Sequence, residues 1–180
     1  MARERKNRQL CLKPQDVLLA LKLCSDSEME GAPYAALAAS VGLTTSETHG
    51  GIHRAAIAGL VRVDKVGRHP ARKAILEFLL HGVRYAYPAE RGRLVRGMAT
   101  SYGPPPLNEF ILPGAEPPPV WPDARGNARG PRLWPLYPSV PLAAGNDDRL
   151  YRLLALVDAM REGRVREREI AARNLQELLA

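Results

Sequence analysis

The sequence predicts a mainly α-helical protein with a small β element, in the α+β class. Two observations predict it: apolar residues recur at helical spacing through most of the chain, and only short β-type runs separate them. A third observation divides the chain, because twelve of its sixteen prolines fall between Pro104 and Pro141, where they favour extended backbone. We therefore expect a first domain over residues 1–100, a proline-rich arm over 101–145 and C-terminal helices over 146–180.

The first domain is expected to begin with three helices. Pro14 suits the first turn of the first helix, Pro33 opens the second, and Gly42 ends the second as a glycine beyond the last turn does. Thr44 or Thr45 caps the third helix, which runs to about residue 58. The inward-facing side chains of the first two helices are expected to be Val17, Leu18, Leu21, Cys24, Tyr34, Leu37, Ala38 and Val41.

Short strands are expected at Leu60–Val66 and Gly82–Tyr87, with a helix at Pro70–His81 between them. After the arm, Asn146 or Asp147 caps one helix, and a last helix covers Arg164–Leu179. The first of these two has an apolar stripe, which we expect to contact a second copy or a partner. The alternative is that it packs on the chain's own core. The stripe comprises Leu150, Leu153, Leu154, Val157 and Met160.

Positive charge is concentrated in one stretch of the chain. The 26 Lys and Arg residues exceed the 19 Asp and Glu residues by seven, and residues 31–97 alone hold ten basic and four acidic side chains. A stretch that gathers positive charge is where a nucleic-acid surface is expected, and a solvated basic face would have the same composition. Charge alone leaves both interpretations open.

The functional prediction depends on residues 37–61, LAASVGLTTSETHGGIHRAAIAGLV. This segment resembles the helix-turn-helix of bacterial winged-helix regulators such as the MarR type. With the helix before it and the strand after it, the resemblance covers roughly half of the chain. Gly50 and Gly51 depart from the pattern because they lie within a helix, and Thr48 replaces the usual apolar residue. The matching residues are Leu37, Ala38, Val41, Gly42, Leu43, Thr44, Ser46, Ile52, Ala58, Gly59, Leu60 and Val61.

The resemblance implies a winged helix-turn-helix over residues 1–100, with a recognition helix at about 44–58 and a basic wing at about 61–73. The N-terminal turns of such a helix enter the major groove, and the wing contacts the phosphate backbone. An ordinary solvated hairpin is the alternative for the wing. The predicted DNA contacts are Thr45, Ser46, Glu47, His49, Gly50, His53, Arg54, Arg62, Lys65, Arg68 and Arg72.

The proline-rich arm contains more apolar side chains than a free linker does. We expect these side chains to pin the arm to its own domain or to a dimer mate, in preference to a mobile linker. They are Phe110, Ile111, Leu112, Trp121, Trp134 and Tyr137.

The sequence does not predict an enzyme. It contains no Walker loop, GxSxG motif or Rossmann glycine pattern, and His49 and His53 lack the glutamate of a zincin motif and a third metal ligand. Cys11 and Cys24 have no metal-ligand spacing. We expect no cofactor and no metal. The start has no apolar secretory segment and no run approaches 18 apolar residues, so we expect a cytoplasmic protein without a membrane contact.

These observations together predict a transcriptional regulator that binds double-stranded DNA as a homodimer. The alternative is a protein-interaction module, such as an antitoxin-like partner that binds a toxin through the arm and the C-terminal helices. The two functions can coexist, because antitoxins often repress their own operon.

Overall fold

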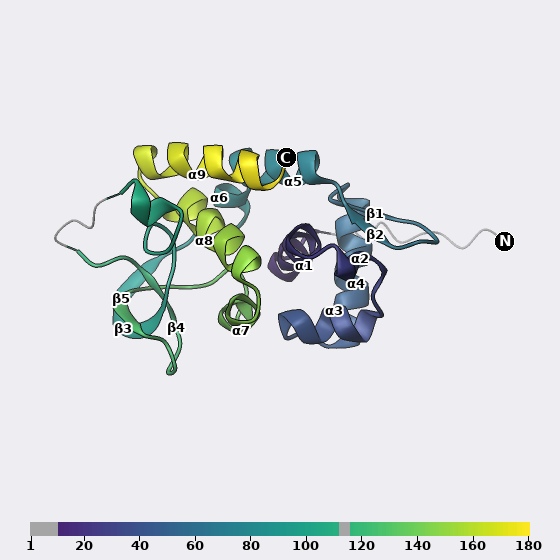
Figure 1. The fold of residues 1–180 in the computed structure, drawn as a ribbon, viewed down its shortest axis with the longest axis horizontal. Coiled ribbons are helices and arrows are strands. Elements are labelled where there is room, and N and C mark those ends of the chain that lie inside the picture. The colour runs from purple at the N-terminus through teal and green to yellow at the C-terminus, as the bar shows by residue number, and fades with distance from the viewer. Residues whose placement is uncertain (1–10, 112–115) are drawn as a thin grey trace.

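The computed structural model describes residues 11–111 and 116–180. It confirms the α+β class, since helices dominate and the strands form two small sheets. The N-terminal helices and a β hairpin lie at one end of the molecule, and a three-stranded sheet lies at the other (Figure 1). The helices over residues 140–162 lie between these two ends, and the last helix runs along the top of the molecule.

The three helices predicted for the first domain are present. Gly42 ends the second of them in the left-handed conformation, with φ 67°, and its N–H donates to the carbonyl of Ala38. Seven of the eight predicted inward side chains are buried, and Tyr34 is half-buried. The helices are α1 (Pro14–Ser25), α3 (Tyr34–Val41) and α4 (Thr45–Ile57), with the short α2 (Glu28–Gly31) between α1 and α3.

An antiparallel hairpin follows α4. It consists of β1 (Val61–Val63) and β2 (Arg68–Pro70). The first strand is shorter than the predicted Leu60–Val66 because Asp64 begins the turn. Its carboxylate accepts hydrogen bonds from the N–H groups of Val66, at 2.9 Å, and Gly67, at 3.1 Å.

The predicted strand at Gly82–Tyr87 is wrong, because this segment contains the short helix α6 (Val83–Ala86). The predicted helix before it is α5 (Arg72–His81). Ile75, Leu79 and Val83 are four residues apart and fully buried, so the apolar stripe of α5 continues into α6 and packs against α8 (Asp148–Glu162).

The second sheet joins residues on both sides of the predicted arm boundary. In this sheet β3 (Arg91–Ala99) pairs antiparallel with both β4 (Val120–Pro122) and β5 (Ala128–Leu133). Because β4 also pairs with β5 in parallel, the three strands close on one another. A 3-10 turn, η1 (Leu107–Glu109), lies between β3 and β4. The proline-rich segment therefore supplies two strands to the domain that precedes it.

The arm is pinned to its own domain by Trp121. This side chain is fully buried, and its indole Nε1 donates a 2.5 Å hydrogen bond to Oδ2 of Asp158 on α8. Thr100 donates to the same oxygen at 2.8 Å. Trp134 and Phe110 are not anchors, since each remains 54% exposed. Leu112 lies outside the described residues.

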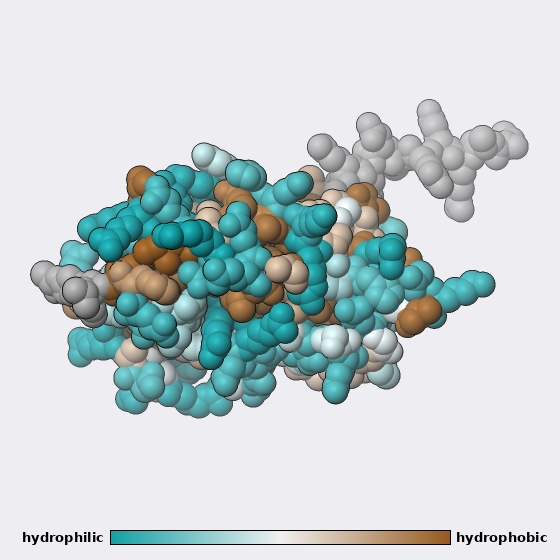
Figure 2. All heavy atoms as spheres, turned by 45° about the horizontal axis from the view of Figure 1, so that its top comes forward, coloured by the Kyte–Doolittle hydropathy of each residue, from teal (hydrophilic) through white to brown (hydrophobic). Residues whose placement is uncertain are grey.

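The expectation that the apolar stripe of α8 contacts a second copy is wrong. All five of its residues are buried, in one cluster with the core of α1. The packing alternative is therefore the correct one, because α8 contacts α1, α6, α7 (Val140–Gly145) and α9 (Val165–Leu178). On the face that carries α5 and α9, hydrophobic side chains are scattered among hydrophilic ones (Figure 2).

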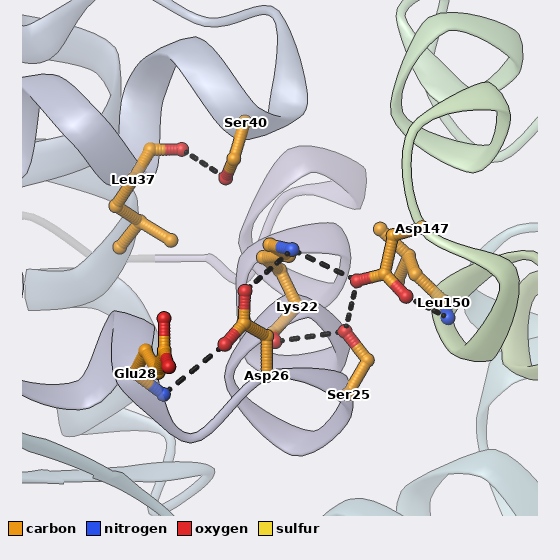
Figure 3. Close-up of polar contacts among 8 residues, drawn as sticks. All are labelled: Lys22, Ser25, Asp26, Glu28, Leu37, Ser40, Asp147 and Leu150. Carbon is orange, nitrogen blue, oxygen red and sulfur yellow. Dashed lines mark hydrogen bonds and ion pairs between the residues drawn. The ribbon is translucent and has the colours of Figure 1, made fainter.

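A partly buried polar cluster joins α1 to the start of α8 (Figure 3). Lys22 Nζ lies 2.8 Å from Oδ2 of Asp147 and 3.1 Å from Oδ2 of Asp26. Ser25 donates to Asp147 at 2.7 Å, and the other oxygen of Asp147 caps α8 by accepting from the N–H of Leu150 at 2.9 Å. Burial opposes ionisation of Asp147, but Lys22 and these donors outweigh it and hold the pKa of Asp147 below its usual range.

Candidate nucleic-acid interface

Helix α4 begins with a complete capping box. The hydroxyl of Thr44 accepts from the N–H of Glu47 at 3.2 Å, and the Glu47 carboxylate accepts from the N–H of Thr44 at 2.9 Å. The hydrogen bonds from Thr44 hold the pKa of Glu47 below its usual range. The Glu47 carboxylate is thus engaged at the cap, which fixes the start of the helix but leaves less of this side chain for a ligand.

Two of the residues at which this helix departs from the winged-helix pattern, Thr48 and Gly51, have structural explanations. Thr48 is fully buried, and its hydroxyl donates to the carbonyl of Thr44 at 3.0 Å, so its polar group is satisfied within the helix. Gly51 faces α1: a Cβ there would lie 2.6 Å from Cδ1 of Leu19 and 3.0 Å from Oδ1 of Asp16. Gly51 therefore allows α1 and α4 to pack closely.

The opposite face of α4 is open to solvent. It brings together five of the predicted contact residues, and Gly50 lies beside them half-buried. The His49 ring lies 5.0 Å from the ring of Tyr34, a tilted contact that orients it. The exposed side chains are polar groups that can donate or accept hydrogen bonds: Thr45, Ser46, Glu47, His49 and His53.

Arg54 was predicted as a DNA contact, and the structure gives it a different role. Its Nε donates to Oδ2 of Asp16 at 2.8 Å and its Nη2 donates to Oδ1 at 2.7 Å. Asp16 is fully buried and also caps the start of α1, accepting from the N–H of Lys13 at 2.8 Å. Because a buried carboxylate needs this counter-charge, Arg54 holds α4 onto α1.

Arg68 is also committed to the fold. It is buried, its guanidinium donates to the carbonyl oxygens of Met29, at 2.9 Å, and Ala32, and it lies 4.5 Å from the ring centre of Tyr34. The spacing of Arg68 in the sequence placed it on a wing, but β2 turns this side chain inward against α2. The prediction of a phosphate contact at Arg68 does not match this position.

Arg72 likewise points away from the hairpin. Its Nη2 donates to the carbonyl of Cys24 at 3.3 Å, near the C-terminal end of α1, where a cation is favourable. Burial raises the pKa of the Cys24 thiol to about 11, so this thiol stays protonated. Of the four predicted arginine and lysine contacts beyond position 61, two remain solvent-exposed: Arg62 and Lys65.

The hairpin presents Arg62, on β1, and Lys65, in the turn, to solvent. The side chain of Arg62 is 76% exposed, and the nearest carboxylate oxygen, Oδ2 of Asp64, lies 3.8 Å away. Both cations are therefore available to a polyanion. Val63 and Val66 beside them are exposed as well.

His69 on β2 is a functional candidate that the sequence did not reveal. Its Nδ1 lies 2.6 Å from Oε2 of Glu30 and its Nε2 lies 3.3 Å from Oδ1 of Asp64. Hydrogen bonding, chiefly to Glu30 and secondly to Asp64, raises the pKa of His69 above its ordinary value. The imidazole thus links the hairpin to α2. The sequence does not show this link, because residues 30 and 69 come together only in the folded chain.

The turn between α3 and α4 is flanked by α7, a neighbour that no local pattern predicted. The Ser139 hydroxyl donates to the carbonyl of Val41 at 2.6 Å. A Cβ at Gly42 would lie 2.9 Å from Cδ2 of Leu142. Residues of the proline-rich arm therefore extend the surface beside the start of α4.

The described part of the chain offers little for other kinds of site. Within residues 11–111 and 116–180, no three His, Cys, Asp or Glu side chains are grouped closely enough to hold a metal ion. None of the helices described there has both the length and the apolar composition needed to cross a membrane.

No protein family, no curated protein and no solved structure matches this chain.

Proposed function

We propose that this protein is a DNA-binding transcriptional regulator whose first domain is a winged helix-turn-helix. In this proposal α3 and α4 form the helix-turn-helix, and β1 and β2 form the wing. The order of three helices followed by an antiparallel hairpin supports it. So does the glycine turn at Gly42, which joins α3 to a capped helix.

One observation carries the proposal: the exposed face of α4 begins directly at its N-terminal cap. Ser46, His49 and His53 lie on this face, where the N-terminal turns of a recognition helix meet base edges. Arg62 and Lys65 on the hairpin are free to contact phosphates. A homodimer would place two such helices on half-sites one helical turn apart.

The test is duplex DNA binding measured at several salt concentrations, with the region upstream of the gene and a scrambled duplex as probes. Affinity should fall steeply with salt because each neutralised phosphate contributes about 0.9 to the slope of log K against log salt. The upstream region should bind more tightly than the scrambled duplex. An affinity for duplex DNA that does not change with salt, or no binding at low salt, would overturn the proposal.

A second candidate function is protein binding, such as capture of a toxin by an antitoxin-like partner. The observation that favours it is the exposed indole of Trp134, which lies 4.4 Å from the Arg132 guanidinium. Trp134 borders a pocket of about 160 Å³ formed with Pro122, Pro135, Pro138 and Pro141. Co-purification that is lost on Trp134→Ala, with DNA affinity unchanged, would support this candidate.

A further inference from the structure

The surface of α4 and the hairpin holds fewer free cations than the sequence led us to expect. Arg54 pairs with Asp16, and Arg68 donates to backbone carbonyls of α2 and its C-cap. Arg72 donates to a carbonyl at the end of α1. Arg62 and Lys65 remain, close to the carboxylate of Asp64. The positive charge of residues 31–97 is therefore divided, and part of it lies on β3 at the other end of the molecule.

The β3–β5 pair carries arginines whose charge is not neutralised. Arg96 on β3 and Arg129 on β5 are direct partners in the antiparallel register, so their side chains share one exposed face. Like charges directly opposite one another destabilise a sheet. Among residues 11–111 and 116–180, neither side chain has a carboxylate within ion-pair distance. A polyanion on this face would remove the repulsion.

The Arg96 side chain is already held in place. Its Nε donates a 2.6 Å hydrogen bond to the carbonyl of Gly126 in the β4–β5 turn, which leaves its terminal nitrogens free for a ligand. Arg125 in the same turn is 82% exposed and lies 3.8 Å from Oδ1 of Asp123. The turn and the two strands thus present three arginines and one acidic side chain together.

This basic face is continuous with the helix-turn-helix surface. Arg125 and Asn127 line one side of a pocket of about 450 Å³, and Leu142 of α7 lines the other. The same Leu142 reaches the turn at Gly42, directly before α4. The β4–β5 turn, α7 and the start of α4 therefore follow one another across one surface.

We infer that Arg96, Arg125 and Arg129 form a second contact with the phosphate backbone of the duplex bound by α4. This inference rests on the proposed function, and it assigns to the β3–β5 sheet a role that the winged-helix resemblance does not include. Its contribution is independent of base sequence, because it is made to phosphates. It lengthens the DNA footprint beyond the recognition helix, across α7.

The experiment compares the wild type with R96A/R129A in duplex binding over a range of salt concentrations. We expect the double variant to weaken binding to the upstream region and to the scrambled duplex by the same factor. We expect its slope against log salt to fall by about 1.8, since each lost phosphate contact removes about 0.9. R166A/R173A is the matched control, because it removes two exposed arginines from α9, the helix along the top of Figure 1, and none from the sheet at the lower left. Its slope should stay near that of the wild type.

Folding and the two proposals are separated by further variants. R96K/R129K keeps the charge and should keep the slope. R96Q/R129Q removes the charge but keeps long polar side chains, and its slope replaces that of R96A/R129A if the alanine variant fails to fold by circular dichroism. If R96A/R129A and R166A/R173A give equal slopes while substitutions of Ser46 and His53 still weaken discrimination, the second contact is refuted and the proposed function stands. If the wild type binds no duplex, both proposals fail.

Discussion

Lys22 and Asp147 lie 125 positions apart in the chain, and their charged groups meet at 2.8 Å between α1 and α8. The side chain of Lys22 is 7% exposed and that of Asp147 is 13% exposed, so water screens this pair poorly. One carboxylate therefore caps α8 and ties it to the first helix of the domain.

Asp147→Ala should destabilise the fold by about 3 kcal/mol, because it removes the helix cap and leaves Lys22 with Asp26 alone. Asp147→Asn is the matched control, since asparagine also caps helices, and we expect it to cost about half as much. Urea denaturation measures both. Equal effects of the two variants would show that the cap adds nothing and that loss of the charge accounts for the whole cost.

The same pair predicts how stability depends on pH. Because the pKa of Asp147 is lowered in the folded state, its contribution is complete above the unfolded pKa of about 3.9 and is lost as the pH falls through the folded value. Asp147→Asn should reduce this loss of stability in acid. The measurement is the urea midpoint between pH 2 and pH 6 for both proteins.

Removal of residues 146–180 should unfold the remaining chain. The reason is that α8 supplies buried side chains to the core that also covers α1, among them Leu153 and Leu156. Circular dichroism and thermal melting are the measurements. A truncated chain that melts cooperatively would contradict the prediction that α8 belongs to the same core as α1. Residues 146–180 would then be a separate interaction segment.

Arg54→Ala should lower stability rather than act selectively on DNA binding. It leaves the carboxylate of Asp16 buried without its counter-charge, at a cost of about 3 kcal/mol. Arg62→Ala, a control at an exposed position, should stay within about 0.5 kcal/mol of the wild type. A double-mutant cycle with Asp16→Asn measures the coupling, and a coupling energy near zero would contradict the assigned role.

Alanine at Ser46, His49 or His53 should reduce discrimination between the upstream region and random duplex more than it reduces binding to random duplex. Alanine at Arg62 or Lys65 should weaken both about equally. His81→Ala, at an exposed histidine on α5, is the control and should change neither. Equal effects from the helix and the hairpin would show that α4 does not read sequence.

The attachment of the hairpin to α2 should weaken as the pH rises. Because hydrogen bonds to Glu30 and Asp64 raise the pKa of His69, its contribution is complete below the unfolded pKa of about 6.5 and is lost as the pH rises through the folded value. The protection of the hairpin amides against hydrogen exchange, after correction for the intrinsic increase of exchange with pH, should therefore fall across this range. His69→Gln should abolish this fall in protection, and a wild-type hairpin with the same corrected protection at all these pH values would contradict the prediction.

The sequence by itself determined the local structure of this protein. The helices at α1, α3, α4, α8 and α9 follow from apolar spacing, and their ends follow from residues such as Gly42 and Thr44. These features depend on hydrogen bonds within a few residues, so a single segment contains the information that specifies them. The exposed polar face of α4 could be predicted for the same reason.

Only the tertiary structure decided which charges are free and which surfaces are covered. Arg54 meets Asp16 across 38 positions, and Trp121 meets Asp158 across 37. The stripe of α8 is covered by α1 and its neighbours, and β3 finds its partners within the proline-rich arm. No local pattern encodes these contacts, because burial of a charge or an apolar side chain depends on segments that are distant in sequence and adjacent in space.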